Sequence, residues 1–283
     1  MTQLYKFIAR PDDVQFLLQG CLKFTPIPEL NDPSELLPNV IPEDVHESLS
    51  RLRKDGYSDG DMVHLRQQGE LLQRLAPNFQ AIDVPRTKEE ATIVVRSKFY
   101  DNFPLLEQLL EQTAAQISSK VGLLCLTRRS DSLPMWAHYA QNAAGLVVEF
   151  RDHLDKIFCG DATGILCRPT SVRYERARLG VTFDPQTQDS LFFAKFQDWS
   201  YEQEVRVVLP LAECRQQKIG DHQLHLFDVN PKCVARVILG WRMGSISIDR
   251  VIALVKSINP DVEVVQAKIT KGQVILGDCL YPA

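Results

Sequence analysis

Long apolar runs are missing from the 283-residue sequence, and neither sign of charge is in large excess. No segment reaches the roughly 18 consecutive apolar residues of a membrane-spanning helix, and residues 1–10 lack the apolar core of a secretory signal, so we expect neither feature. Lys and Arg total 32 against 36 Asp and Glu, which gives a net charge of −4. This balance excludes a protein that coats nucleic acid over its whole surface, but it is compatible with a local basic patch.

The seven cysteines are odd in number and scattered, and they include no Cys-x-x-Cys pair, which argues against a structural zinc site. We expect reduced thiols packed as small apolar groups in a cytoplasmic protein. Short catalytic signatures are missing too: there is no Gly-x-Gly-x-x-Gly, Gly-Lys-Ser/Thr, Gly-x-Ser-x-Gly or His-Glu-x-x-His. Rossmann, P-loop, serine-hydrolase and zinc-protease classes are therefore disfavoured.

Periodicity divides the sequence into three parts. Strands are predicted over residues 4–8 and 22–25, with a helix between them that Gly20 ends. Helical spacing of apolar residues over 42–119 predicts a helical insertion. Beyond it we predict strands over 123–127, 145–150, 171–174, 204–209, 234–239 and 262–267, and helices over 132–140, 190–196 and 246–255. The expected architecture is one α+β domain, residues 1–283, with a mixed, mainly antiparallel sheet and an N-proximal helical block.

The first candidate site is the aromatic segment 131–140. On a helix, Trp136 and Tyr139 share a face with Met135, and their rings form a flat wall on which a nicotinamide, adenine or base ring can stack. His138, beside this face, is suited to hydrogen-bond a ribose or a phosphate. A core-facing aromatic helix with a partly exposed histidine has the same spacing, so both interpretations stay open.

The second candidate is the acidic pair that begins the strand predicted near residue 204. On a strand, Glu202, Glu204 and Arg206 project from one face. Two carboxylates this close repel each other, so we expect a raised pKa in one of them or pairing with Arg206. The arrangement suits orienting a ribose hydroxyl, stabilising an oxocarbenium cation or general acid–base catalysis. An exposed strand of alternating charge is the other interpretation.

The most basic stretch of the chain places four arginines around one tyrosine: Arg168, Arg173, Tyr174, Arg176 and Arg178. Arginine beside tyrosine is suited to hold phosphate or nucleic acid. A solvated edge strand that uses positive charge against aggregation gives the same pattern. The loop that contains Asn31 and Asp32 is likewise either a turn or a ligand contact.

Several motifs occur together in an order that resembles one family. They are Leu4-Tyr5-Lys6-Phe7, Leu22–Pro26, Leu30-Asn31-Asp32-Pro33, Cys125-Leu126-Thr127, Met135–Ala140, Gly145–Phe150, Lys195-Phe196, Trp199–Arg206 and Ile238-Leu239-Gly240. Over nearly its whole length the chain resembles the bacterial domain-of-unknown-function family 2971, whose name implies no activity.

A further similarity is to ADP-ribosyltransferase-type domains. These carry a polar residue on the first strand, a hydroxyl or aromatic residue in the middle and a late catalytic glutamate, and the corresponding residues here are Tyr5 or Lys6, Thr127 or Tyr139, and Glu202-x-Glu204. The similarity implies that Glu204 holds the nicotinamide ribose and stabilises the cation, while Glu202 activates or orients the acceptor. It also implies that Tyr139 or Trp136 stacks on nicotinamide. Together with the residue patterns above, the predicted substrate-binding set is Tyr5, Lys6, Asn31, Asp32, Thr127, Trp136, His138, Tyr139 and Arg206.

Three functions stay open at this point. The first is a transferase that uses NAD or another nucleotide, without a metal, in bacterial conflict or phage defence. The second is a non-enzymatic regulatory module that holds a nucleotide, RNA or partner protein through the Trp136–Tyr139 wall and the arginines. The third is a metal-dependent hydrolase or nuclease that uses Asp32, Glu202 and Glu204. An enzyme needs both glutamates beside Trp136 and Tyr139, whereas a binding module tolerates them exposed and apart.

Overall fold

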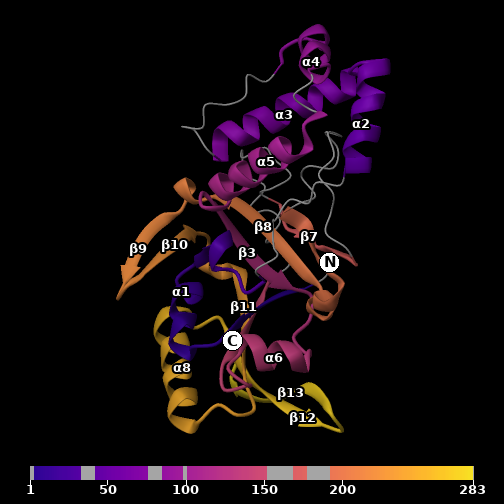
Figure 1. Ribbon diagram of the computed structural model, residues 1–283. Helices are drawn as coiled ribbons and strands as arrows, with labels where there is room; N and C mark the ends of the chain where they lie inside the picture. The colour runs from indigo at the N-terminus through magenta and orange to yellow at the C-terminus, as the bar shows by residue number, and fades with distance from the viewer. Residues whose placement is uncertain are drawn as a thin grey trace.

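The computed structural model describes residues 3–32, 42–75, 85–97, 101–151, 168–176 and 192–282. A large eleven-stranded sheet forms the middle of this part of the chain, with helices on both faces (Figure 1). Its strands are β1 (Leu4–Ile8), β2 (Cys21–Pro26), β3 (Val121–Thr127), β4 (Leu146–Phe150), β5 (Thr170–Ser171), β8 (Glu204–Pro210), β9 (Arg215–Ile219), β10 (His222–Asp228), β11 (Val234–Leu239), β12 (Glu263–Thr270) and β13 (Gln273–Tyr281). Two further short strands, β6 (Arg173–Glu175) and β7 (Ala194–Phe196), form a parallel pair.

Strand β3 is the branch point of the large sheet. It pairs along its whole length with β8, and β5 continues the sheet beyond β8. The other edge of β3 is shared, because β1 pairs at Thr127 and β2 pairs at Gly122 and Leu123. From β1 the sheet continues through β4, β11, β12 and β13, and from β2 it continues through β10 and β9. All neighbours are antiparallel except β11 and β12, which helix α8 (Ser245–Ile258) connects as a parallel pair.

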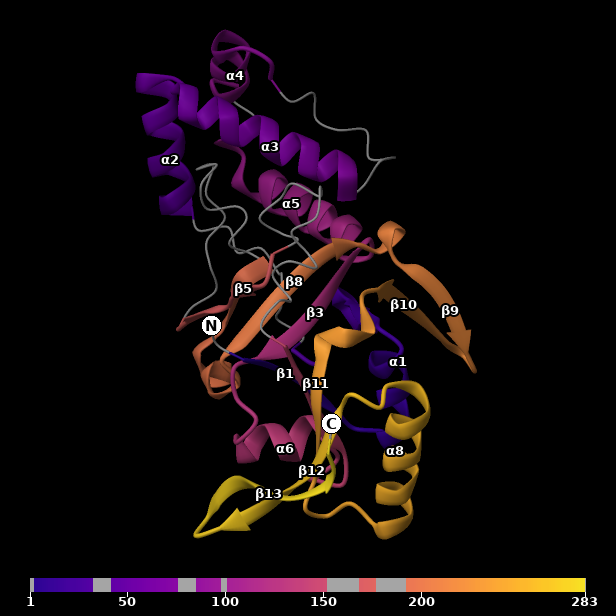
Figure 2. The same ribbon diagram turned by 180° about the vertical axis from the view of Figure 1, so that it is seen from behind.

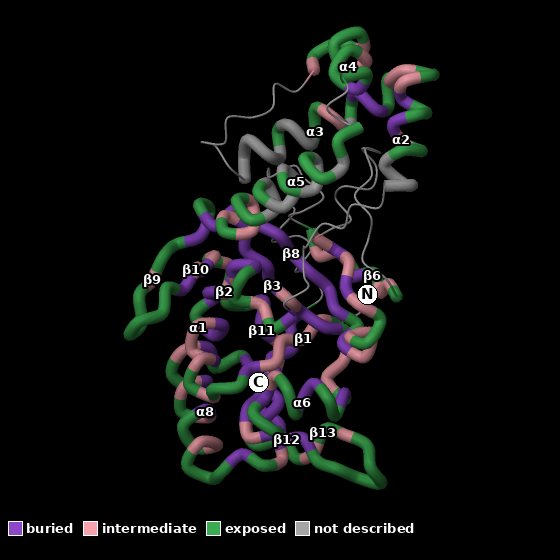
Figure 3. The backbone as a smooth tube through the Cα atoms, in the orientation of Figure 1, coloured by how far each residue is buried: buried purple, intermediate pink, exposed green. Residues whose placement is uncertain are grey.

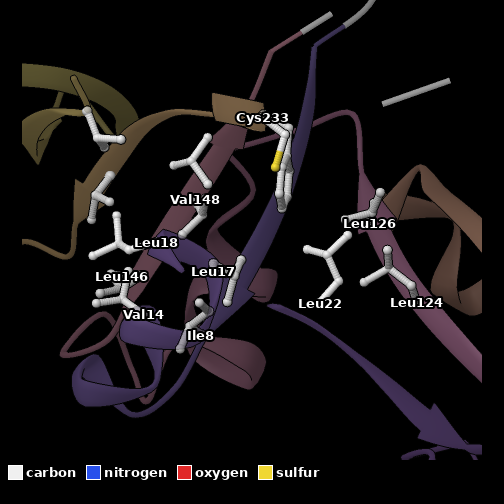
Figure 4. Close-up of a cluster of buried hydrophobic side chains, with 14 of the residues drawn as sticks. Ile8, Val14, Leu17, Leu18, Leu22, Leu124, Leu126, Leu146, Val148 and Cys233 are labelled. Carbon is white, nitrogen blue, oxygen red and sulfur yellow. The ribbon is translucent and has the colours of Figure 1, made fainter. Parts of the chain in front are cut away.

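One face of the sheet holds the largest apolar cluster. Helices α1 (Val14–Leu18) and α8 lie side by side against this face (Figures 1 and 2). Figure 4 shows Val14 and Leu18 of α1 near Val148 of β4, while Leu124 of β3 lies with Leu22 and Leu126 in another part of the same cluster. Because side chains alternate along a strand, the residues next to Leu124 point to the opposite face.

Gly20 ends the first helical turn, as the sequence predicts. Its φ of +80° lies in the left-handed region that side chains disfavour, and a Cβ there would lie 2.2 Å from the carbonyl oxygen of Val229. The chain can therefore reverse from α1 into β2 only through a glycine.

The opposite face of the sheet carries two separate apolar clusters. Helix α6 (Leu133–Tyr139) covers one of them, where Trp136 packs with Val147 of β4 and Ile238 of β11. Leu123 of β3 and Val208 of β8 belong to the other. The ends of β3 and β8 that meet between these clusters carry polar residues, and the candidate site lies there.

In the described part of the stretch predicted to be helical, four α-helices lie between β2 and β3 in the sequence. They are α2 (Pro42–Asp55), α3 (Asp59–Leu75), α4 (Lys88–Val95) and α5 (Phe103–Ser118). Figures 1 and 2 show them together at one end of the molecule, away from α1 and α8. Their described residues are largely exposed in Figure 3, in contrast to the buried strands below them. No helix in the described ranges is long and apolar enough to span a membrane.

The α+β fold with a mainly antiparallel sheet is confirmed, while single elements differ from expectation. The helix predicted over 190–196 is wrong, because residues 194–196 form strand β7. Strands β9, β10 and β13 were not predicted, since their exposed positions are mixed polar and apolar and give no clear alternation. That the whole chain folds as one domain stays a prediction.

Candidate functional site

A row of polar residues crosses the face of the sheet on which α6 lies. Residues paired across neighbouring strands share a face, so the registers define this row. It runs from Glu263 on β12 through Arg236 on β11, Glu149 on β4, Tyr5 on β1 and Thr127 on β3 to Glu204 on β8. The fold therefore aligns Tyr5, Thr127 and Glu204, which come from three separate sequence motifs.

Glu202 does not lie on the strand, so the prediction that it projects from a strand face is wrong. It ends the 3-10 helix η6 (Gln197–Glu202), and Gln203 follows in the left-handed conformation with φ 43° and ψ 50°. The backbone fixes this turn, because the Gln203 amide donates to Ser200 O at 3.3 Å and Gln203 O accepts from the Arg128 amide at 3.2 Å. The two carboxylates nevertheless meet.

Lys195 of β7 joins the two carboxylates. Its Nζ donates to Glu202 Oε2 at 2.9 Å and to Glu204 Oε2 at 3.2 Å. The ammonium also lies 4.7 Å from the ring centroid of Trp199, a cation–π contact. Its side chain is 3% exposed. Sequence reasoning missed Lys195 as a site residue; the available signal was one lysine within the apolar run Phe192–Phe196.

Arg206 forms a bidentate pair with Glu204, which confirms the predicted pairing of a carboxylate with this arginine. The distances are 2.8 Å from Nε to Oε1 and 2.9 Å from Nη2 to Oε2, and Nη1 donates to Phe192 O at 3.0 Å. Burial raises the pKa of Glu204, but the charges of Arg206 and Lys195 outweigh this effect and lower the pKa from 4.5 to about 2. Glu204 is therefore ionised at neutral pH, and the interpretation as an exposed strand is wrong.

Tyr139 of α6 links Glu202 to the surface. Its hydroxyl donates to Glu202 Oε1 at 2.5 Å and accepts from Asn31 Nδ2 at 2.6 Å. Burial, and then the hydrogen bond to Glu202, raise the pKa of Tyr139, so it stays protonated. Asn31 is exposed, whereas Glu202 is buried. A hydrogen-bonded path therefore leads from solvent to one oxygen of Glu202.

Two hydroxyl groups hold the backbone on either side of this path. Thr127 Oγ1 donates to the carbonyl oxygen of Glu202 at 2.5 Å. The Glu204 amide donates to the hydroxyl of Tyr174 at 2.7 Å, and burial raises the pKa of Tyr174 to about 12. These contacts fix the positions from which both carboxylates project.

A strained turn anchors the end of α6 beside this cluster. Gln141, Asn142 and Ala143 all have positive φ, at 49°, 52° and 65°. Ala143 is buried, its carbonyl oxygen accepts from the Arg242 amide at 3.0 Å, and its amide donates to Trp136 O at 3.1 Å. Three consecutive left-handed residues persist only where surrounding contacts hold them, so the position of Tyr139 is closely specified.

Trp136 lies in the core and forms no stacking wall. Its side chain is fully buried, its Nε1 donates to Ser130 O at 2.7 Å, and its ring lies 5.3 Å from that of Phe7 and 5.2 Å from that of Trp241. The prediction that Trp136 and Tyr139 form one wall is therefore wrong in this structure. The half-buried Trp199 and Tyr201, whose ring centroids are 6.1 Å apart, lie on η6, the helix that ends at Glu202.

Lys6 and Tyr5 make structural contacts within the sheet and beside it. Lys6 Nζ donates to Cys125 O at 3.1 Å, in the gap that β1 and β2 leave along β3, and burial lowers the pKa of Lys6. The Tyr5 hydroxyl donates to Gln3 Oε1 at 3.0 Å, and its ring packs against the cluster around Trp136.

The remaining predicted residues lie around the cluster or outside the described part. Asp32 is buried next to Asn31, and His138 is exposed beside Tyr139, with ring centroids 6.3 Å apart. The exposed arginines are Arg168, Arg173 and Arg176, whereas Arg178 lies outside the described residues. Among the described residues, no three His, Cys, Asp or Glu side chains gather as a metal-binding group.

Comparison with known proteins adds one finding. Residues 135–207 match the model of a family described as a protein of unknown function (DUF2971). The matched segment contains Tyr139, Lys195, Glu202, Glu204 and Arg206, but it leaves out Asn31 and Thr127. No curated protein and no solved structure matches the chain.

Proposed function

We propose that the protein cleaves the glycosidic bond of NAD and transfers ADP-ribose to an acceptor. The observation that carries the proposal is the meeting of Glu202, Glu204 and Tyr139, from three elements, in one buried cluster. Buried carboxylates with a hydrogen-bonded path to the surface are typical of sites that handle charge or protons. The resemblance to ADP-ribosyltransferase-type domains supports the same assignment.

The hydrogen bonds assign different roles to the two glutamates. A carboxylate has about four acceptor positions, and Glu204 uses them on Arg206, Lys195 and the Cys125 side chain. Glu204 is then a positioning residue that holds Lys195 in place, and the proposal departs here from the resemblance, which implies that Glu204 stabilises the cation. Glu202 accepts one side-chain hydrogen bond on each oxygen, from Lys195 and from Tyr139, so it has capacity left for substrate.

The proposed step conserves atoms and charge. The bond between ribose C1′ and the nicotinamide nitrogen breaks, and its electron pair leaves with neutral nicotinamide. Carboxylate charge at Glu202 stabilises the ribosyl cation while an acceptor oxygen bonds to C1′. The acceptor proton passes to the Tyr139 oxygen as the Tyr139 hydroxyl proton passes to Glu202.

The test is nicotinamide release from NAD by the purified full-length chain and by Tyr139→Phe. Removing the hydroxyl interrupts the proton path, so release should slow by about a hundredfold. Tyr5→Phe is the matched control, because it also removes a tyrosine hydroxyl, one that donates to Gln3 rather than to Glu202. Its rate should stay close to that of the wild type.

Two outcomes would overturn the proposal that the protein is a transferase. One is wild-type protein that binds NAD, measured by calorimetry, and releases no nicotinamide with or without a nucleophilic acceptor such as a short oligonucleotide or a histone-like basic peptide. The other is equal loss of release in Tyr139→Phe and Tyr5→Phe, which would assign the hydroxyls a structural role.

A non-enzymatic nucleotide-binding module is the second candidate, and a specific observation favours it. The charges of Glu202 and Glu204 are balanced by Lys195 and Arg206, and buried networks of this kind also occur as purely structural features. Binding of NAD without turnover supports this candidate. The same pairing leaves Glu202 and Glu204 poorly suited as metal ligands, so a metal-dependent hydrolase is not proposed.

A further inference from the structure

We propose that the surface formed by Arg128, Arg168, Arg173 and Arg176 with Trp199 and Tyr201 binds single-stranded nucleic acid. As the place where the acceptor of ADP-ribose docks, this surface rests on the proposed function. The proposal that it binds nucleic acid is independent of that function, because it is argued from the contacts of these residues and is tested without NAD.

The arginine segment is fixed directly to the strand that carries Glu204. Strand β5 pairs with β8 through Thr170 opposite Arg206 and Ser171 opposite Val205. Immediately after β5, the Val172 amide donates to Glu204 O at 2.9 Å. The segment 168–176 therefore lies along the beginning of β8, next to the buried carboxylates.

Arg128 extends this surface from the end of β3. Its Nη2 donates to Ser171 Oγ at 2.9 Å, and its amide donates to Gln203 O at 3.2 Å. Gln203 is the residue between the two glutamates. Arg128 thus connects the arginine segment with the turn that carries Glu202 and Glu204, and its side chain is exposed.

The arginine side chains of this surface are positively charged and exposed to solvent. Arg128, Arg168, Arg173 and Arg176 are all exposed, and none of them forms a salt bridge with a carboxylate among the described residues. The neighbouring Arg129 differs, because it is paired with Asp131 at 2.9 Å. Apart from the buried Glu202, the acidic residues of segment 168–176 and helix η6 are Glu175 and Asp198, so four cations face two acids. Guanidinium groups bind phosphate oxygens in a bidentate manner.

Aromatic rings complete the surface and favour an unpaired strand. Helix η6, which carries Trp199 and Tyr201, lies between β7 and β8 in the chain, and β7 pairs with β6. Trp199 and Tyr201 are both half-buried, so part of each residue is exposed to solvent. A base can stack on such a ring only when it is unpaired, and the carboxylates of an acidic protein segment lack the wide aromatic face that makes this stacking favourable.

The test uses fluorescence anisotropy with a labelled 12-nucleotide oligo-uridine, the same length of oligo-thymidine, and a duplex of equal length. The variant Arg173→Ala/Arg176→Ala should bind the single strands at least tenfold more weakly. The slope of log affinity against log salt should shrink by about 1.4, because each lost phosphate contact contributes roughly 0.7 for a single strand. Tyr201→Leu should weaken binding roughly tenfold without changing the slope.

The matched control is Lys218→Ala/Arg242→Ala, which removes the same two charges from exposed positions on β9 and after β11. Its affinity should equal that of the wild type. Equal weakening by the control overturns the proposal, as does displacement of RNA by polyglutamate at equal charge, which would point to an acidic protein partner. If the protein binds RNA but releases no nicotinamide, the proposed binding surface is supported and the proposed transferase function is overturned. If it releases nicotinamide but does not bind RNA, only the proposed binding surface is overturned.

Discussion

The polar row that crosses the sheet has an acid–arginine pair at each end, and the two ends differ in their contact with water. At the β8 end, the side chains of Glu204, Arg206 and Lys195 are 4%, 0% and 3% exposed. At the β12 end, Arg236 and Glu263 are 29% and 28% exposed, and Arg236 also pairs with buried Glu149 at 3.0 Å. The same residue chemistry is therefore placed in two environments.

This difference in exposure shows at which end the ion pairs are not explained by their contribution to the stability of the sheet. Water screens the Arg236 end, so a cross-strand ion pair there is inexpensive and adds little stability. Burying two carboxylates and two cations costs several kcal/mol per ion before their attraction offsets it, and an apolar cluster would stabilise the same position as well. The buried end is therefore the one for which a function is expected.

The largest effect is expected from Arg206→Met, which leaves Glu204 buried beside Lys195 alone. We expect a loss of about 3–5 kcal/mol in the free energy of unfolding, measured by urea denaturation. If the variant does not fold, Glu204→Gln/Arg206→Met provides the second measurement, because removing both charges should restore much of the loss. A loss below about 1 kcal/mol in the single variant would mean that water reaches Glu204.

The pH dependence of stability should separate the two ends next. The pKa of Glu204 is lowered to about 2 in the folded protein from an ordinary 4.5, so its stabilising contribution is complete above pH 4.5 and is lost as the pH falls toward 2. Within this window the wild type should lose about 1.4 kcal/mol more per pH unit than Glu204→Gln. Parallel pH profiles of the two proteins would contradict the low pKa.

Arg236→Met tests the exposed end and should cost less than Arg206→Met. Glu149 keeps the hydrogen bond from Gln3 Nε2 at 2.8 Å, and water can reach the vacated position, so we expect a loss of about 1–2 kcal/mol in urea. Addition of 1 M salt should reduce the difference between wild type and variant, since salt screens the exposed pair. A cost equal to that of Arg206→Met would remove the distinction between the ends.

The smallest effect is expected at Gln203, the left-handed residue between the two glutamates. Glycine adopts φ 43° without strain, so Gln203→Gly should be neutral or stabilise the protein by up to about 1 kcal/mol. Gln216→Gly, on the exposed strand β9, is the control and should destabilise by about 0.5–1 kcal/mol. The same sign for both variants in thermal unfolding would show that residue 203 carries no strain.

Local sequence patterns indicate the strands and motifs around the candidate site, but they do not indicate how the side chains of these motifs are arranged in space. The sequence predicts strand β1 with its observed bounds, Leu4–Ile8, because turn residues follow a short run of residues that favour strands. The motif around Tyr139 and the pair Glu202 and Glu204 also stand out in the sequence, and the structure brings Tyr139 and Glu202 into contact, whereas their role in a functional site stays a prediction. What could not be predicted is the side of the helix that faces the core: Trp136 and Tyr139 share a face in sequence, yet one is buried and the other reaches Glu202.

The contacts between distant segments could not be read from the sequence. Lys195 occurs in a short apolar run that resembles a helix, and only the pairing of β6 with β7 places it against both carboxylates. The left-handed Gln203 is likewise a result of tertiary contacts, since glutamine has no local preference for that conformation. The fold class follows from periodicity, whereas the ion pairs of Lys195 depend on how β7 and η6 pack beside β8.

The most direct measurement compares the initial rates of nicotinamide release from NAD by Glu202→Gln and Glu149→Gln. Both glutamates are buried and both accept a hydrogen bond from a cation, Lys195 and Arg236 respectively, so the same chemical change is made beside the β8 end of the row and beside Arg236. The prediction is a wild-type rate for Glu149→Gln and a rate lower by about a hundredfold or more for Glu202→Gln. Equal rates in the two variants, whether high or at background, would contradict the assignment of function to the buried end.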